Sequence, residues 1–268
     1  MPEVISQKNR RIVAAVWLLG FILIWEFVSF LLVKTLGPDT AATKLPYLHT
    51  VIATFAANWQ PLLEAGGVTF SRAALGFFIG AGVGILLAVI MSLSKVAERI
   101  AFPYLIISQM IPVLGLAPII FNIVRDMNAS RIIIAAYITF FPVAVNMLSG
   151  LKSVEQDKKD LLYSIAASKF SVYRKLMFPF SMPYLFTGLK ITAPMAVTAS
   201  ILVDMLGSSS GIGVKILYSL YSSSSDIFWA SVLTSAFMGI ISFHIVNLLE
   251  KLLLPWKRAA VRKEGDAS

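Results

Sequence analysis

Long apolar runs separated by short charged clusters form the pattern of this chain. Residues 73–94, 100–124 and 132–151 contain no charged residue, and residues 12–33 contain only Glu26. A helix needs about 20 mostly apolar residues to cross the hydrocarbon core of a membrane, and lipid offers no partner to unsatisfied backbone groups. The pattern therefore predicts an all-α membrane protein with six transmembrane helices, at 12–33, 73–94, 102–124, 131–151, 184–207 and 228–253.

The composition agrees with a membrane protein. Of the 268 residues, 57% are hydrophobic and 14% are charged, whereas a soluble domain carries about 25% charged residues. The mean hydropathy is +0.80 and the net charge is +9. Such a basic balance is typical of proteins that bind nucleic acid or a membrane surface, and the apolar excess favours the membrane, with no nucleic-acid partner. The absence of cysteine excludes disulfides, zinc–thiolate sites and thiol nucleophiles.

The distribution of lysine and arginine predicts the orientation. With the N-terminus inside, the cytoplasmic segments hold 15 of these residues and the outer segments hold 6, as the positive-inside rule requires. We therefore expect a multi-pass protein of the plasma (inner) membrane with both termini cytoplasmic and the first span retained. The expected parts are a tail and first span (1–33), an extracellular segment (34–72) with a helix over 50–59, a permease core (73–254) containing a cytoplasmic loop (152–183), and a cytoplasmic tail (255–268).

The cytoplasmic loop is the most informative soluble segment. Its sequence predicts a helical piece, a break near 166–168, and a second short helix over 169–176. Ser168 is placed to cap the second helix, and Pro179 and Pro183 are expected to end it. Apolar side chains beside basic ones on a short helix suit docking into a groove of a partner protein. The alternative is a solvated basic connector.

The same loop resembles the permease subunits of ABC importers, the binding-protein-dependent transport inner-membrane components. Asp160 falls at the acidic position of their cytoplasmic signature, Ala166 at its glycine, and Pro179 at its proline. The likeness is stronger over 165–191, and the motif of Asp204 followed by a Gly-Ile-Gly segment at 211–213 extends it. It includes Leu-Pro at 45–46, Ile-Pro at 111–112, Ala-Pro at 117–118 and Phe-Pro at 141–142.

Within that family the chain looks like the nitrate, sulfonate, taurine and thiamine-pyrimidine importer group. That group often has a Trp-Phe-Gly-like turn after the third helix, whereas this chain has Asn-Ile-Val-Arg-Asp at 122–126. The cargo is therefore left open among nitrate, a sulfonate or taurine, and a thiamine-pyrimidine or riboflavin-type vitamin precursor.

The resemblance implies a division of labour between subunits. Two permease copies, as a homodimer, would form the path, two ATPase subunits would hydrolyse ATP, and an extracellular or periplasmic binding protein would deliver the cargo. The chain has no Gly-x-x-x-x-Gly-Lys-Ser/Thr phosphate loop, so ATP and Mg²⁺ are expected on the partner, and this chain is expected to be no enzyme, with no catalytic residue, cofactor or metal. The residues that would contact the ATPase are Asp160, Ala166, Ala167, Ser168, Lys169, Phe170, Tyr173, Arg174 and Pro179.

Polar and proline residues within the third and fourth spans are candidates for the translocation path. Proline in a membrane helix frees carbonyl groups and is tolerated where protein or a water-filled cavity replaces the lost bond. Simple packing between helices is the alternative. The candidates are Ser108, Gln109, Pro112, Asn122, Thr139 and Asn146.

The second span carries Gly76, Gly80 and Gly84 at a spacing of four residues. One face of that helix is therefore nearly bare backbone, which allows another helix to approach closely. Packing within the subunit is the first interpretation, and a path-lining or dimer face is the second.

Glu26 and Asp204 are the acids deep within predicted spans, where a carboxylate suggests a functional site. We expect Asp204 to order the Ser/Gly-rich outer loop 208–226 with Lys215 or Arg131, and Glu26 to pair within the bundle. His244 is expected to be a hydrogen-bonded packing residue. An ion-coupled secondary transporter is the main alternative function. Such proteins usually carry proton-relay acids within the membrane or inverted repeats, and the two isolated acids and the absence of an evident repeat argue against it. No acid pair or Ser/His/Asp set supports a membrane enzyme.

Overall fold

The computed structural model describes residues 7–256, and this part of the chain is helical and contains no strand. The predicted all-α class is confirmed. The first six residues and most of the predicted tail 255–268 lie outside the described range. The elements are α1 (Gln7–Leu36), α2 (Pro38–Lys44), α3 (Leu48–Ala57), α4 (Trp59–Leu93), α5 (Lys95–Met110), α6 (Val113–Val124), α7 (Met127–Lys152), α8 (Gln156–Ser164), α9 (Lys169–Val172), the π-helical turn η1 (Tyr173–Met177), α10 (Phe178–Met205), α11 (Ile212–Tyr221) and α12 (Ser225–Leu253).

Five helical stretches of the described chain are long and apolar enough to cross a membrane. They are α1 from Ile12, α4, α7, the continuous stretch Lys169–Met205, and α12. The bent pair α5 and α6 supplies a sixth crossing when it is counted as one broken span. Five of the predicted spans are thus present, and the sixth depends on counting this bent pair as one span.

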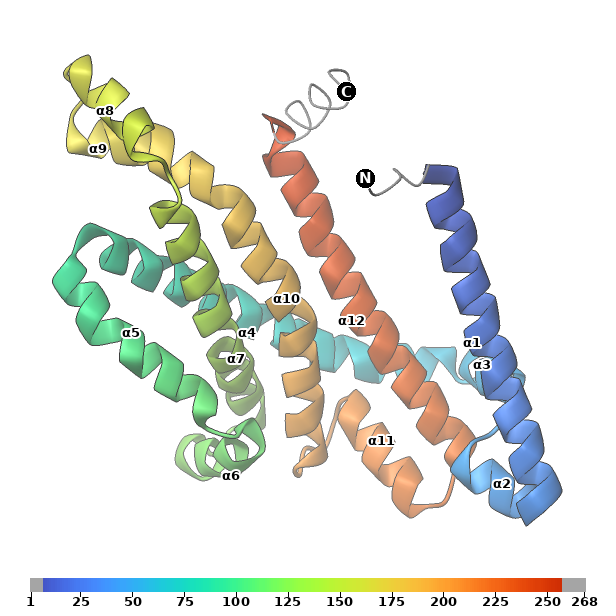
Figure 1. Cartoon of the computed structure of the whole chain (residues 1–268). Coiled ribbons are helices and arrows are strands. Elements are labelled where there is room, and N and C mark those ends of the chain that lie inside the picture. The colour runs from blue at the N-terminus through green and yellow to red at the C-terminus, as the bar shows by residue number, and fades with distance from the viewer. Residues whose placement is uncertain (1–6, 257–268) are drawn as a thin grey trace.

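Helices α4, α7 and α10 form the centre of the bundle. In Figure 1, α7, α10 and α12 run side by side, while α4 crosses behind them. A core of buried side chains lies where α4, α7 and α10 meet, including Ala88, Val143, Met147 and Leu185. In contrast, α1 lies at the edge of the bundle, and most of its apolar side chains are exposed.

The glycine stripe of α4 lies against α7. A Cβ atom placed on Gly76 would lie 2.5 Å from the Ala135 Cβ, and one placed on Gly80 would lie 2.4 Å from the Ala136 carbonyl oxygen. A Cβ on Gly84 would lie 2.5 Å from the carbonyl oxygen of the next turn of α7. These distances are far shorter than van der Waals contacts, so a side chain at any of the three positions would clash with α7. Glycine at these positions therefore allows the close approach of the two backbones.

The span predicted over 102–124 is broken into two helices. Helices α5 and α6 meet at an angle of 103°. The break falls at Ile111 and Pro112, where Ile111 is extended with φ −75° and ψ 120°. Proline lacks a backbone N–H and forces the preceding residue out of the helical region, so the Ile-Pro pair interrupts the helix. The predicted path residue Asn122 consequently lies on α6, beyond the break.

The prolines after the cytoplasmic loop do not end a helix, contrary to prediction. Pro179 lies in the first turn of α10, and Pro183 lies inside it, so the chain stays helical from Lys169 to Met205. The turn η1 explains this continuity, because the Phe178 N–H bonds the Tyr173 carbonyl five residues earlier. The wider turn shifts the hydrogen-bond register just before Pro179, where an N–H is missing.

Four further segments differ from the predicted bounds. Helix α4 begins at Trp59, within the predicted extracellular segment, and α5 begins at Lys95, where the Ser94 hydroxyl accepts a hydrogen bond from the Ala97 N–H at 3.2 Å. The predicted outer loop 208–226 contains helix α11. The helix expected over 50–59 is observed as α3, which ends at Ala57.

The two ends of the bundle carry different elements. In Figure 1, α8 and α9 lie at the same end as the beginning of α1 and the end of α12. Helices α2, α6 and α11 lie at the opposite end. This arrangement places the predicted partner-binding loop and both ends of the described chain on one side.

Candidate functional site

The segment from α8 to η1 projects from one end of the bundle and is largely exposed (Figure 1). It presents apolar side chains to solvent: Leu161 is 67% exposed, and Ile165 and Phe170 are each 70% exposed. Exposed apolar side chains on a segment that projects from a bundle are typical of surfaces that contact other proteins.

The break between α8 and α9 is a defined helix-ending motif. Ala166 adopts the left-handed conformation with φ 59°. Its N–H bonds the Tyr163 carbonyl at 2.9 Å, and the Ala167 N–H bonds the Leu162 carbonyl at 3.0 Å. These are the two bonds of a Schellman motif, whose left-handed position is usually glycine. Ala166 is the residue that aligns with the glycine of the importer signature.

The start of the second helical piece is fixed by a cap and by contacts with the bundle. As predicted, Ser168 caps α9, because its hydroxyl accepts a hydrogen bond from the Ser171 N–H at 3.2 Å. Val172 is buried, and the Tyr173 hydroxyl lies 3.0 Å from the Ser92 hydroxyl at the end of α4. The Phe170 side chain, in contrast, is exposed. The cap and these contacts therefore hold the start of the second helical piece against the bundle and leave Phe170 accessible.

All nine residues predicted to contact the ATPase lie between α8 and the first turn of α10. Ala167, Tyr173 and Pro179 are half-buried there. The others are exposed, namely Asp160, Ala166, Ser168, Lys169, Phe170 and Arg174. The geometry gathers these side chains on one projection.

The residues predicted for the translocation path do not gather in one place. Thr139 is buried against Gly80 of α4, and its hydroxyl donates to the Ala135 carbonyl at 2.8 Å. The Asn146 side chain faces Gly188 of α10 and donates to the Pro142 carbonyl at 2.8 Å. On the bent pair, the Ser108 hydroxyl donates to its own helix at 2.6 Å, and the other three are exposed, namely Gln109, Pro112 and Asn122.

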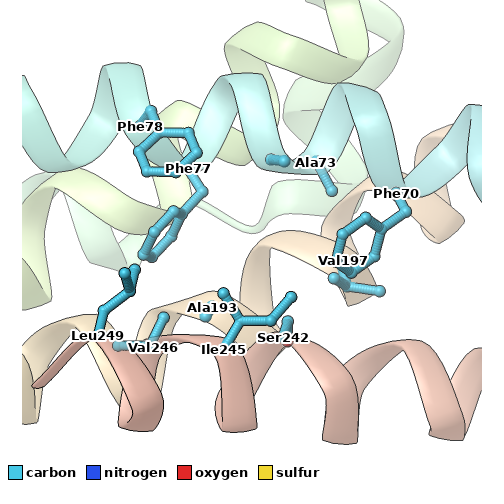
Figure 2. Close-up of a pocket in the computed structure, with 11 residues that line it drawn as sticks. Phe70, Ala73, Phe77, Phe78, Ala193, Val197, Ser242, Ile245, Val246 and Leu249 are labelled. Atoms are coloured by element: carbon cyan, nitrogen blue, oxygen red, sulfur yellow. The ribbon is translucent and has the colours of Figure 1, made fainter. Parts of the chain in front are cut away.

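An apolar cavity of about 130 Å³ lies between α4, α10 and α12. Figure 2 shows Phe70, Phe77 and Phe78 of α4 on one side and Ile245 and Leu249 of α12 on the other. The hydroxyl in its lining, that of Ser242, already donates to the Gly239 carbonyl at 2.7 Å. A site for a polar solute needs placed polar groups, so this cavity is not suited to such a solute.

Buried polar side chains cluster at the end of the bundle opposite to α8. Arg131 of α7 and Asp204 of α10 form an ion pair with 2.6 Å between Nε and Oδ1. One of the two predicted partners of Asp204 is therefore correct, and Lys215 is not among its contacts. Sequence reasoning missed Thr69 of α4, whose hydroxyl donates to Asp204 at 2.5 Å. The sequence around a helical threonine does not indicate which distant residue its hydroxyl will contact.

Other charge pairs connect helices within residues 7–256, including that of Lys152 in α7 with Glu98 in α5. Glu26 of α1 accepts hydrogen bonds from both the backbone and the ring of His49 in α3, at 3.2 Å and 3.1 Å, as expected of an acid that pairs within the bundle. Sequence reasoning missed the pair of Lys190 in α10 with Glu250 in α12. His244 bonds the Ile240 carbonyl of its own helix at 2.9 Å. Among residues 7–256, no group of three His, Asp or Glu side chains could hold a metal.

In the part of the chain that the structure describes, apolar helices form a bundle with a helix–break–helix projection at one end. The family model of the binding-protein-dependent transport system inner membrane component matches residues 80–258, and the chain belongs to this family.

Known relatives agree with this membership. The chain is 31% identical over 190 residues to the formylaminopyrimidine transport permease protein ThiX of Halalkalibacterium halodurans. This alignment covers 71% of this chain and 76% of that protein. It is 26% identical to the putative aliphatic sulfonates transport permease protein SsuC of Bacillus subtilis, over 91% of this chain and 89% of that protein. It is 23% identical to the nitrate import permease protein NrtB of Synechococcus elongatus, over 85% and 84%.

A solved structure has the same fold. The chain matches a crystal structure of an amino acid ABC transporter with a TM-score of 0.60 and 16% identity, over 73% of this chain and 96% of that one. The chain is thus a multi-pass permease subunit of an ABC importer, as the resemblance implied. The ion-coupled alternative has no support in these comparisons.

Proposed function

We propose that this permease passes a small polar solute inward across the plasma membrane by alternating access, with a separate ATPase bound at α8, α9 and η1. The observation that carries the proposal is the rigid projection of exposed apolar side chains, Phe170 foremost. A protein surface of this kind gains affinity when an aromatic side chain enters a pocket of its partner. ATP and Mg²⁺ would be bound by that partner.

The proposed orientation places both termini and the projection in the cytoplasm. Figure 1 puts the beginning of α1, the end of α12 and α8 at one end of the bundle. With this orientation, the predicted cytoplasmic segments contain 15 lysine and arginine residues and the predicted outer segments contain 6, in accord with the positive-inside rule. The end with α2, α6 and α11 would then face the extracellular or periplasmic binding protein.

The proposed cargo belongs to the classes that the relatives carry. The names of those relatives specify formylaminopyrimidine, aliphatic sulfonates and nitrate. We propose a small polar solute of this range: nitrate, a sulfonate or taurine, or a thiamine-pyrimidine or riboflavin-type precursor. Two copies of the chain would form the path between them, which is consistent with path candidates on the exposed surface of α5 and α6.

Reconstitution in liposomes tests this function. The permease is combined with its ATPase and binding protein, and uptake of labelled nitrate, taurine and formylaminopyrimidine is measured with and without ATP. We expect uptake of one of these solutes that requires ATP, the ATPase and the binding protein together. Uptake by the permease alone, driven by a proton or sodium gradient, contradicts the proposal.

A further inference from the structure

One hydroxyl group joins three helices at the end of the bundle opposite to α8. Thr69 of α4 donates to Asp204 Oδ2 of α10 at 2.5 Å and accepts a hydrogen bond from the Ile212 N–H of α11 at 2.9 Å. All three residues are buried, with no more than 1% of their surface exposed. A buried donor or acceptor costs free energy when it loses its partner, so this hydroxyl fixes the relative positions of α4, α10 and α11.

Arg131 extends the cluster to α7 and to the turn between α10 and α11. Its Nε pairs with Asp204 at 2.6 Å, and its Nη1 donates to Asn128 Oδ1 at 3.0 Å. The remaining nitrogen donates to the Ser208 hydroxyl and the Ser210 carbonyl, both within the turn. The guanidinium group therefore holds the turn to the same carboxylate that Thr69 contacts.

The backbone of the turn is shaped around the Asp204 carboxylate. Gly211 has φ +118°, and a Cβ atom there would lie 2.2 Å from Asp204 Oδ2. A Cβ atom on Gly213 would lie 2.6 Å from the Asp204 Cβ, and the Gly213 N–H approaches Oδ2 at 3.4 Å. Only glycine allows this approach, so α11 starts at a place set by the carboxylate.

The helix that carries Asp204 begins at the proposed ATPase contact. The chain is helical without interruption from Lys169 to Met205, a stretch of 37 residues. At 1.5 Å per residue this helix is about 55 Å long. Its first residues belong to the projection with Phe170, and its last turn belongs to the cluster with Thr69 and Arg131. One helix thus connects the two ends of the bundle.

We propose that Thr69, Arg131 and Asp204 are positioning residues that make α11 follow the movement of the ATPase-bound projection. Because the cluster ties the far end of the long helix to the turn and to α11, a displacement that begins near Lys169 reaches α11. Without the cluster, the turn at 206–211 would absorb the displacement. This inference rests on the proposed function, since it requires an ATPase at α8–η1.

A label on α11 tests the inference. The chain has no cysteine, so Tyr218→Cys, at a position 75% exposed on α11, gives a single site for a spin label. The permease–ATPase complex is trapped with ATP, Mg²⁺ and vanadate, and the change in label mobility is measured against the nucleotide-free complex, together with the ATPase rate. No cargo is needed.

Conservative variants separate a positioning role from a structural one. Thr69→Val keeps the shape but removes the hydroxyl, Thr69→Ser keeps the hydroxyl, and Thr198→Val removes an exposed hydroxyl that bonds only its own helix, at 3.1 Å. In the Thr69→Val complex we expect the label response to fall at least fivefold while the ATPase rate stays within twofold. Thr69→Ser and Thr198→Val should respond like the parent.

Two results with the Thr69→Val complex would overturn the inference. One is an undiminished label response in the Thr69→Val complex, and the other is an equal loss of label response and ATPase rate, which indicates a structural role alone. A parent complex that hydrolyses ATP but shows no label response also overturns it, and leaves the proposed function intact. Failure of the parent chain to bind any ATPase contradicts the proposed function instead.

Discussion

The Arg131 guanidinium and the Asp204 carboxylate lie 2.6 Å apart, and their side chains are 1% and 0% exposed. A charge in such surroundings is tolerated only because its partner is present. Removing one member of a buried ion pair costs about 3–5 kcal/mol, whereas replacing both by apolar residues of similar volume is often neutral. Asp204 also accepts hydrogen bonds from the Thr69 hydroxyl and from the Gly213 N–H.

We therefore expect Asp204→Asn to lower the free energy of unfolding by about 3 kcal/mol or more, because it leaves Arg131 buried without a counter-charge. Thermal unfolding in detergent measures the effect. The double variant Arg131→Met with Asp204→Leu should recover a large part of the loss. Equal stability of Asp204→Asn and the parent protein contradicts the prediction.

The contact of α4 with α7 predicts that alanine substitution at two nearby glycines of α4 changes stability by very different amounts. Gly80→Ala should destabilise the protein by about 1–3 kcal/mol, since the new Cβ would lie 2.4 Å from the Ala136 carbonyl oxygen. Gly82→Ala is the matched control, because no atom lies within 4 Å of its Cβ position. Thermal unfolding of both variants provides the comparison. An equal loss of stability in Gly82→Ala and Gly80→Ala contradicts the close contact of Gly80 with α7.

The left-handed conformation of Ala166 predicts a stabilising substitution. Ala166→Gly should raise the free energy of unfolding by about 1 kcal/mol, because glycine adopts φ near +59° without the strain of a Cβ atom. Ala166→Val should lower it. Because a local gain can be hidden in global unfolding, limited proteolysis of the segment 160–170 is the second measurement. Faster cleavage of the Ala166→Gly variant argues against the Schellman motif.

The proposed ATPase contact predicts a loss of binding without a loss of fold. Phe170→Asp should weaken copurification of the ATPase about tenfold or more, since it places a charge where an aromatic side chain enters the partner. The ring is 70% exposed, so the isolated permease should unfold at the parent temperature. Tyr218→Asp, at the opposite end of the bundle, is the control and should leave copurification unchanged. If both variants bind the ATPase equally well, the contact lies elsewhere.

Much of the bundle follows from local sequence. The apolar runs predicted the spans because a membrane tolerates only helices with satisfied backbones, and Ser168 could be recognised as a cap because capping depends on adjacent residues. The sequence predicted one span over 102–124, whereas the structure has two helices that meet at 103° there. The continuity past Pro179 was also missed, because it depends on a π-helical turn that has no clear sequence signal.

The sequence by itself determined the class of protein, the positions of the long apolar helices and the segment that forms the projection, because these depend on composition, periodicity and short motifs. Only the tertiary structure decided that Arg131, rather than Lys215, pairs with Asp204, and that Thr69 completes the cluster. These residues lie up to 135 positions apart. Their contact depends on how α4, α7 and α10 pack, and the glycines of α4 allow that packing.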